Sequence, residues 1–111
     1  MIQILLASYN SEKFLAQQLE SLFAQSCQEF EVIISDGGSQ DGTLAIIADF
    51  QKRYPDRLRL VSTEPARACQ NFARLLAAAD SELMMFCDHD DVWKADKIAI
   101  SLAAYKKLEA E

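Results

Sequence analysis

The sequence predicts an α/β fold in which a mostly parallel sheet carries helices on both faces. Three observations predict this class. Short apolar runs of strand length each end in a polar turn, the segments between them carry apolar residues at helical spacing, and the two kinds of segment alternate along all 111 residues. Such alternation requires crossover connections, which are nearly always right-handed, so the carboxyl ends of the strands should share one edge of the sheet.

The first pair of elements is an apolar run at 2–7 (IQILLA) and a helix beginning near Leu15. Leu15, Leu19, Leu22 and Phe23 fall at offsets of zero, four, seven and eight, which is the spacing of one helix face. Ser11 lies just before this stripe, and we expect it to be the N-cap of the helix.

The second pair is a strand at 30–35 (FEVIIS), rich in β-branched residues, and a helix at 43–54. A turn containing glycines, residues 36–42, joins them. Ile46, Phe50 and Tyr54 form one helical face, and Pro55 should end the helix because proline cannot continue one.

The remaining elements are strands at 58–62 (LRLVS) and 83–87 (LMMFC), a helix through 72–79 and a final helix over 96–111. The last helix is predicted from the helical spacing of Ile98, Leu102 and Tyr105. The complete order, βαβαβαβ followed by a helix, indicates a Rossmann-like sheet in a single domain, since two independent cores are hard to build at this length.

The composition excludes several classes of function. With 11 basic and 17 acidic residues, the formal net charge is −6, and no Lys/Arg cluster suits a nucleic acid or an anionic membrane surface. No apolar run approaches the roughly 20 residues that span a bilayer, and the apolar start lacks a basic flank. The three cysteines form no CxxC pair, which argues against a disulfide framework or a zinc site. We expect a cytoplasmic protein, with any contact to the inner membrane made through partners.

An acidic turn, Asp88-His89-Asp90-Asp91, directly follows the last predicted strand. Three carboxylates this close repel one another unless water or a cation screens them, and carboxylate oxygens suit Mg²⁺ or Mn²⁺. Asp88, Asp90 and Asp91 are therefore one candidate set of ligands for a divalent cation. The alternative is a solvated acidic loop before the final helix, with His89 facing away as a bystander.

A second turn that could bind a ligand is 35–43 (SDGGSQDGT). Its glycines permit close approach of a ligand to the backbone, and the helix that follows favours an anion at its start. It contains neither GxGxxG nor GxxxxGK[ST], so a dinucleotide fingerprint and a P-loop are absent. The alternative is an ordinary turn between a strand and a helix, with Asp41 as the helix cap.

Short motifs recur in order along nearly the whole chain. They are LASYNS at 6–11, FL at 14–15, SL at 21–22, QS at 25–26, FE at 30–31, ISD at 34–36, GS at 38–39, DGT at 41–43, NF at 71–72, CDHDDVW at 87–93 and Lys97. This series closely resembles the family 2 glycosyltransferases, and its later motifs resemble the rhamnosyltransferase-like branch. The resemblance implies a GT-A fold whose N-terminal half, corresponding to residues 1–111, binds a nucleotide-diphosphate sugar, either UDP- or dTDP-linked.

The resemblance also implies roles for individual residues. The expected nucleotide-binding residues are Ala7, Ser8, Tyr9, Asn10, Asp36, Gly37, Arg67, Asn71, Asp88 and His89. Asp88 and Asp90 match the family's Asp-x-Asp motif, with Asp91 adjacent, which implies a Mn²⁺ or Mg²⁺ ion on the diphosphate. The implied reaction is sugar transfer to an acceptor hydroxyl, in surface polysaccharide synthesis.

Three departures from the family pattern matter. Gly37 stands where the family often has a second Asp that binds the nucleobase, so restoring an aspartate there is expected to tighten nucleotide binding. Arg67 stands near a usual glycine and either reaches the diphosphate or is simply solvated. Family members usually continue past the acidic turn, and no residue here matches their catalytic base, so the catalytic residues are unknown.

The missing acceptor half leaves alternatives open. One is a non-catalytic nucleotide-sugar or metal-binding module that acts as a subunit, completed by another chain or by self-association through exposed strand edges. Another is a receiver-like phospho-acceptor domain, which would need a Lys after a fifth strand that the sequence does not provide. The last is a plain scaffold fragment.

Overall fold

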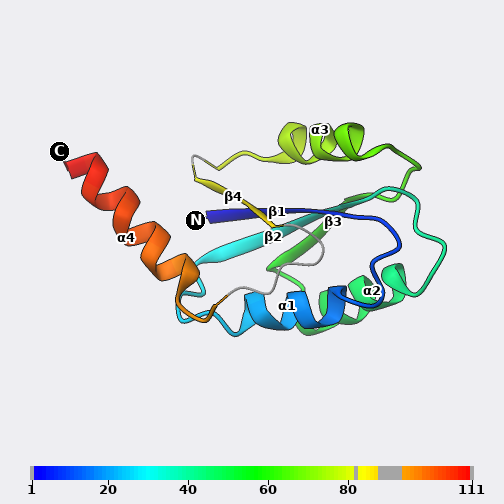
Figure 1. Cartoon of the computed structure of the whole chain (residues 1–111), viewed down its shortest axis with the longest axis horizontal. Helices are drawn as coiled ribbons and strands as arrows, with labels where there is room; N and C mark the ends of the chain where they lie inside the picture. The colour runs from blue at the N-terminus through cyan, green and yellow to red at the C-terminus, as the bar shows by residue number, and fades with distance from the viewer. Residues whose placement is uncertain (1, 82, 88–93, 111) are drawn as a thin grey trace.

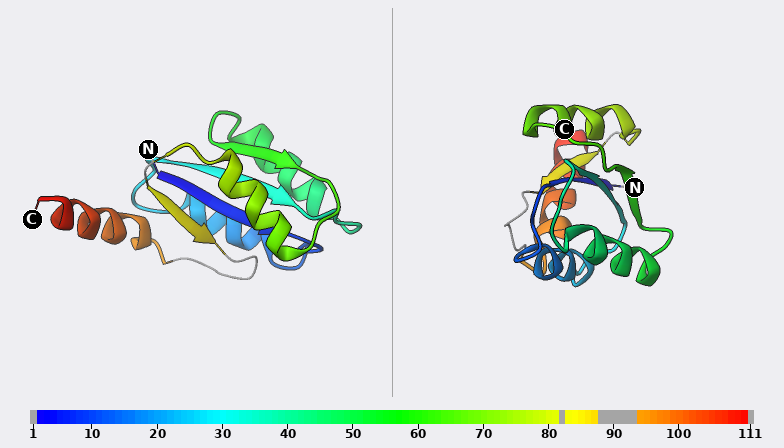
Figure 2. Two further views of the ribbon diagram at one scale, coloured as in Figure 1. Left: turned by 90° about the horizontal axis from the view of Figure 1, so that it is seen from above. Right: turned by 90° about the vertical axis from the view of Figure 1, so that its right-hand side faces the viewer.

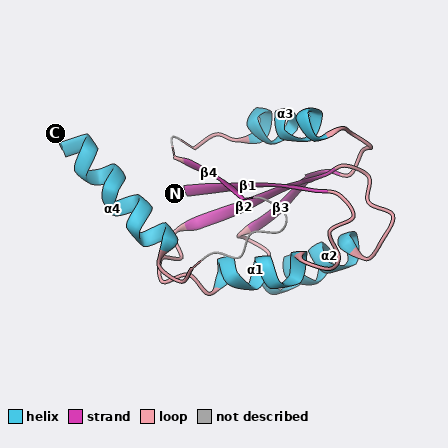
Figure 3. Cartoon of the chain, viewed as in Figure 1, coloured by secondary structure: helices cyan, strands magenta, loops and turns pink. Residues whose placement is uncertain are grey.

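The computed structural model describes residues 2–81, 83–87 and 94–110. Its elements, in order, are β1 (Ile2–Ser8), α1 (Leu15–Phe23), β2 (Phe30–Asp36), α2 (Thr43–Arg53), β3 (Leu58–Ser62), α3 (Ala68–Ala78), β4 (Met84–Cys87) and α4 (Lys97–Ala110). The described strands form one parallel sheet in the order β3-β2-β1-β4 (Figures 1 and 3). The predicted α/β class and the alternation of strands and helices are confirmed.

The strand order creates a topological switch beside β1. The chain moves outward from β1 to β2 and β3, then returns to the other side of β1 to form β4. The register pairs Ser8 with Asp36 and Leu6 with Cys87, so the carboxyl ends of these three strands lie together. Open α/β sheets bind ligands at such an edge, where the strand order reverses.

Helices cover both faces of the sheet, as predicted (Figure 2). The larger core lies on the face that α1 and α2 cover, and includes Ile4 and Leu6 of β1 with Leu15 and Leu19 of α1. The smaller core lies on the opposite face, where α3 packs on β1, β2 and β3; Leu5, Ile33 and Leu75 are its fully buried residues. Burial on both faces explains why the central strands are apolar almost throughout, rather than alternating.

The N-cap positions of α1 and α2 are not the residues that the sequence suggests. Ser11 is not the N-cap of α1, because Phe14 holds that position and the Ser11 carbonyl accepts from the N–H groups of Phe14 and Leu15 in the turn before it. At α2 the N-cap position is Gly42, and the Asp41 carboxylate caps the helix from one residue earlier by accepting from the Thr43 N–H and hydroxyl. These hydrogen bonds, the hydroxyl of Thr43 first, lower the pKa of Asp41.

The last helix, α4, lies within its predicted range 96–111, whereas α3 differs from its predicted range 72–79. α3 starts at Ala68, before the apolar stripe that predicts it. α4 is anchored at its start, where Gln25 accepts from the Ile98 N–H and donates to the Lys94 carbonyl. Beyond this anchor α4 extends away from the sheet, and its Ile100 is 61% exposed (Figure 1). None of the described helices is long and apolar enough to cross a membrane.

Candidate functional site

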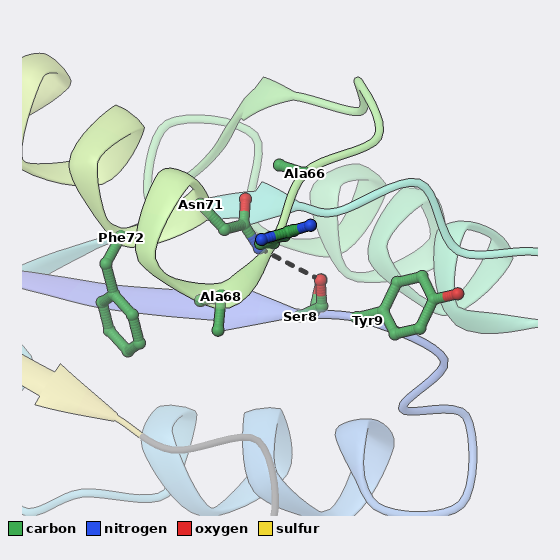
Figure 4. Close-up of a pocket in the computed structure, with 8 residues that line it drawn as sticks. Ser8, Tyr9, Ala66, Ala68, Asn71 and Phe72 are labelled. Carbon is green, nitrogen blue, oxygen red and sulfur yellow. Dashed lines mark hydrogen bonds between the residues drawn. The ribbon is translucent and has the colours of Figure 1, made fainter.

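A cavity of about 510 Å³ opens at the carboxyl end of β1, beneath the start of α3 (Figure 4). Its lining comes from β1 and the following turn, and from the segment that leads into α3: Ala7, Ser8, Tyr9, Ala66, Arg67, Ala68, Asn71 and Phe72. The structure therefore brings Ala7, Ser8, Tyr9, Arg67 and Asn71, all expected in the nucleotide site, to one cavity. Ala66, Ala68 and Phe72 are lining residues that were not among the predicted ones.

Asp36 organises the turn that follows β2. Its carboxylate is completely buried and accepts four hydrogen bonds, from the Ser8 and Ser39 hydroxyls at 2.7 and 2.6 Å and from the backbone N–H groups of Gly38 and Ser39 at 3.1 and 2.7 Å. Four donors satisfy its acceptor capacity. In this structure the carboxylate thus holds the two strand ends together rather than pointing into the cavity.

Asn71 joins α3 to both central strands. Its Oδ1 accepts from the Ser35 hydroxyl at 2.6 Å, and its Nδ2 donates to the Ser8 carbonyl at 3.3 Å (Figure 4). The side chain is only 3% exposed. Asn71 therefore fixes the distance between the start of α3 and the end of β1, which are the two walls of the cavity.

The turns after β1 and β2 bind each other directly. The Asn10 N–H donates to the Ser39 hydroxyl at 2.8 Å, and the Asn10 Oδ1 accepts from the Gln40 N–H at 2.9 Å. Asn10 has φ 47°, in the left-handed region that asparagine tolerates better than most residues. These contacts confirm that the first two polar turns converge at one edge of the sheet. Tyr9, which precedes Asn10, is 57% exposed and lines the cavity.

Gly37 allows the segment before α3 to approach the end of β2. The Ala66 N–H donates to the Gly37 carbonyl at 3.3 Å, and a Cβ on Gly37 would lie 3.0 Å from the Ala66 carbonyl oxygen. The same Cβ would lie 3.6 Å from the Tyr9 ring and from Asn71 Nδ2. Gly37 is thus next to the cavity, and the lack of a side chain there is what permits this close packing.

Among the described residues that line the cavity, Arg67 carries the one charged side chain. Arg67 is exposed, and its backbone N–H is held by Gln70 Oε1 at 3.1 Å. Within residues 2–81, 83–87 and 94–110, its guanidinium group forms no ion pair. A cation beside a helix N-terminus and an exposed aromatic ring suits an anionic ligand that also carries a flat ring.

The predicted metal ligands Asp88, Asp90 and Asp91, with His89, lie outside the described residues. The chain enters that segment from Cys87, whose strand partner Leu6 directly precedes Ala7 of the cavity. Among the residues that are described, no group of three or more His, Cys, Asp or Glu side chains could hold a metal ion. The metal assignment therefore stays a prediction from the sequence.

Comparison with known proteins identifies solved structures of the same architecture. The chain superposes on Staphylococcus aureus TarS 1–349 in complex with UDP with a TM-score of 0.82 and 27% identity, covering 96% of this chain and 32% of that one. It superposes on the mannosyltransferase PcManGT of Pyrobaculum calidifontis, solved with GDP-Man and Mn²⁺, with a TM-score of 0.76 and 26% identity, covering 85% and 28% of the two chains. The fold is thus that of GT-A glycosyltransferases.

Sequence relatives point to the same group. The chain is 36% identical over 98 residues to the dTDP-rhamnosyl transferase RfbG of Shigella flexneri, and 31% identical over 97 residues to the uncharacterized glycosyltransferase alr2836 of Nostoc. These alignments cover 84% and 87% of this chain but only 34% and 30% of the relatives, so the chain spans about a third of their length. The model of the family described as "Glycosyl transferase family 2" matches residues 3–111, and the chain belongs to that family.

Proposed function

We propose that this chain is the donor-binding part of a glycosyltransferase and that its cavity binds the nucleotide of a nucleoside-diphosphate sugar. The observation that carries the proposal is the position of the cavity, which opens at the carboxyl end of β1, the strand beside the topological switch. Support comes from TarS, a structural neighbour that was solved with UDP. UDP and dTDP are the donor nucleotides that we favour, the second because RfbG is named a dTDP-rhamnosyl transferase.

Different residues of the cavity suit different parts of such a ligand. The exposed Tyr9 ring offers an apolar face to the base or the ribose. Arg67 and the N–H groups at the start of α3 suit the diphosphate, because a guanidinium group and a helix N-terminus both favour phosphate oxygens. Asn71 and Asp36 support the site indirectly, because their hydrogen bonds hold α3 and the two turns in place.

A divalent cation is part of the proposal. Asp88, Asp90 and Asp91 would hold Mn²⁺ or Mg²⁺, a choice supported by the carboxylate chemistry of these residues and by the Mn²⁺ of the PcManGT structure. When bound, such an ion neutralises the charge that develops on a nucleoside-diphosphate leaving group.

The complete reaction would transfer the sugar to an acceptor hydroxyl, which attacks the anomeric carbon with help from a carboxylate base. We assign that base to no residue of this chain. Surface polysaccharide synthesis is the role that the relatives suggest, among them the putative teichuronic acid biosynthesis glycosyltransferase TuaG of Bacillus subtilis.

A non-catalytic nucleotide-sugar-binding subunit is the second candidate. It is favoured by the inward-facing carboxylate of Asp36 and by the missing side chain of Gly37, which leave the described lining of the cavity without an acidic group. The two candidates share the binding site and differ in turnover. Release of UDP or dTDP from the sugar donor, with or without an acceptor, would separate them.

Calorimetric titration of the chain with UDP and dTDP, with and without Mn²⁺, tests the proposal. Saturable binding that weakens when Mn²⁺ is chelated is the expected result, and Asp90→Ala should remove the metal dependence while leaving the fold intact. Absence of binding at millimolar nucleotide would overturn the donor-site assignment. Binding with an affinity that Asp90→Ala leaves unchanged would overturn the metal assignment.

A further inference from the structure

The segment Glu64–Arg67, here called the wall segment, forms one side of the cavity without belonging to a helix or strand. Ala66 and Arg67 line the cavity directly. A loop that must hold a ligand-facing cation needs contacts of its own to stay in one position. Two separate sets of contacts meet this need in the structure, one to the turn after β2 and one to α3.

The first set of contacts joins the wall segment to Gly37 and Gly38. The Ala66 N–H donates to the Gly37 carbonyl. Gly38 has φ +91°, and a Cβ there would lie 3.0 Å from Pro65 Cα. Both glycines therefore present bare backbone to the segment, and a side chain at either position would push it outward.

In the second set, the guanidinium group of Arg74 binds the same segment. Nη1 donates to the Glu64 carbonyl at 2.7 Å and to the Ser62 hydroxyl at 3.2 Å, and Nη2 donates to the Pro65 carbonyl at 3.4 Å. Arg74 lies on α3, and helical side chains lean toward the helix N-terminus, which brings this one back over the loop. The planar fork of arginine is suited to holding several acceptors at once, whereas a lysine offers one point charge.

We propose that Arg74 is a positioning residue for the nucleotide site, because it clamps the wall segment against Gly37 and Gly38 and thereby sets the position of Arg67. Arg74 itself does not line the cavity. The inference rests on the proposed function in one respect, the nucleotide as ligand. The Arg74 contacts that form the clamp are present in the chain without a ligand.

The clamp is tested first without nucleotide, by amide hydrogen exchange at Ala66, whose N–H bonds Gly37. Arg74→Gln is expected to speed that exchange about tenfold, as loss of a small hydrogen-bond network should. The matched control is Arg59→Gln, since Arg59 also donates to a carbonyl of α3, that of Ala78 at 3.5 Å, but lies away from the cavity. Unchanged exchange at Ala66 in Arg74→Gln, or an equal change in both variants, would overturn the clamp.

The consequence for binding is tested with UDP. The Kd for UDP is expected to rise about tenfold in Arg74→Ala, to recover partly in Arg74→Lys, and to recover further when guanidinium ion is added to Arg74→Ala. Arg59→Ala should show neither the loss nor the rescue. If the UDP affinities of the Arg74 and Arg59 variants simply decreased in proportion to their thermal stabilities, the positioning role of Arg74 would be contradicted. If the unmodified chain binds no nucleotide, the proposed function fails, while the exchange at Ala66 still decides the clamp.

Discussion

The Ser8 hydroxyl donates to Asp36 Oδ1 at 2.7 Å and joins the carboxyl ends of the two central strands. Both residues are buried, and Asp36 accepts three further hydrogen bonds from Gly38 and Ser39. The edge that carries the cavity is therefore fixed by polar contacts of buried groups. Such contacts are costly to break, because removing one partner leaves the others buried without a partner.

Asp36→Ala should lower the free energy of unfolding by about 3 kcal/mol, because four donors lose a charged acceptor together. Urea denaturation measures the change. Asp56→Ala is the control, since Asp56 is an exposed carboxylate in the turn before β3. A similar loss of unfolding free energy in the two variants would show that the buried network stabilises the fold no more than an exposed carboxylate does.

Asn71→Asp should weaken UDP binding more than it lowers stability. The carboxylate can still accept from the Ser35 hydroxyl but cannot donate to the Ser8 carbonyl, and it adds a negative charge beside a site proposed for a diphosphate. Asn71→Ala, which loses both contacts, should cost about 2 kcal/mol of stability. Equal UDP affinity in Asn71→Asp and the unmodified chain would argue against a diphosphate near this residue.

Gly37→Asp should weaken nucleotide binding, contrary to the expectation from family resemblance that an aspartate there would tighten it. A Cβ would press on the Ala66 carbonyl at 3.0 Å, so the wall segment must move. Gly37→Ala isolates this effect and should lower stability by about 1 kcal/mol. Gly42→Ala is the comparison, because the atom nearest to its Cβ would be Oε2 at the movable end of the Glu12 side chain. Tighter binding in Gly37→Asp would instead support the lost base contact.

Arg67→Gln should raise the Kd for UDP about threefold to tenfold and leave that for uridine nearly unchanged, because the guanidinium group is assigned to the phosphates. The salt dependence of UDP binding should also decrease. Calorimetry at two salt concentrations measures both, with Arg53→Gln on α2 as the control. An equal loss for UDP and uridine would place Arg67 at the base or show that it acts only through the loop.

Asp41 should make stability depend on pH in the acid range. Its pKa is lowered in the folded protein, chiefly by the Thr43 hydroxyl, so the folded state favours the carboxylate. The contribution is therefore fully present above the ordinary aspartate pKa of about 4 and is lost as the pH falls toward the lowered value. Urea denaturation of Asp41→Asn and the unmodified chain should give a stability difference that shrinks below about pH 4. A difference that stays constant down to pH 3 would contradict this role.

The elements that the sequence predicted well are those with strong local signals. The third strand was predicted with its observed bounds, 58–62, and α2 ends at Arg53, just before Pro55. Burial on both faces of the sheet made the central strands β1 and β2 recognisable as apolar runs. Family motifs singled out Ser8, Tyr9 and Asn71 as binding residues, and all three line the cavity.

The parts that escaped prediction depend on contacts distant in sequence. Ser11 resembles an N-cap locally, but its hydroxyl bonds the Tyr9 backbone and its N–H donates to the Thr43 hydroxyl from the next turn. The start of α3 was missed because residues 68–71 (ACQN) carry no apolar stripe. Ala66 and Ala68 offer only methyl groups and backbone, so no chemical signal marks them as part of a site.

Nucleotide binding in the cavity at the carboxyl end of β1 can be observed directly by mapping backbone amide chemical shifts while UDP is added. We expect the largest shifts at Ser8, Tyr9, Ala66, Arg67 and Asn71. A second cavity of about 320 Å³, lined by Gln3, Glu31, Asp80 and Ser81, lies at the other end of the sheet and is an internal control. Shifts confined to that second cavity, or no shifts at millimolar UDP, would show that no nucleotide binds at the carboxyl end of β1.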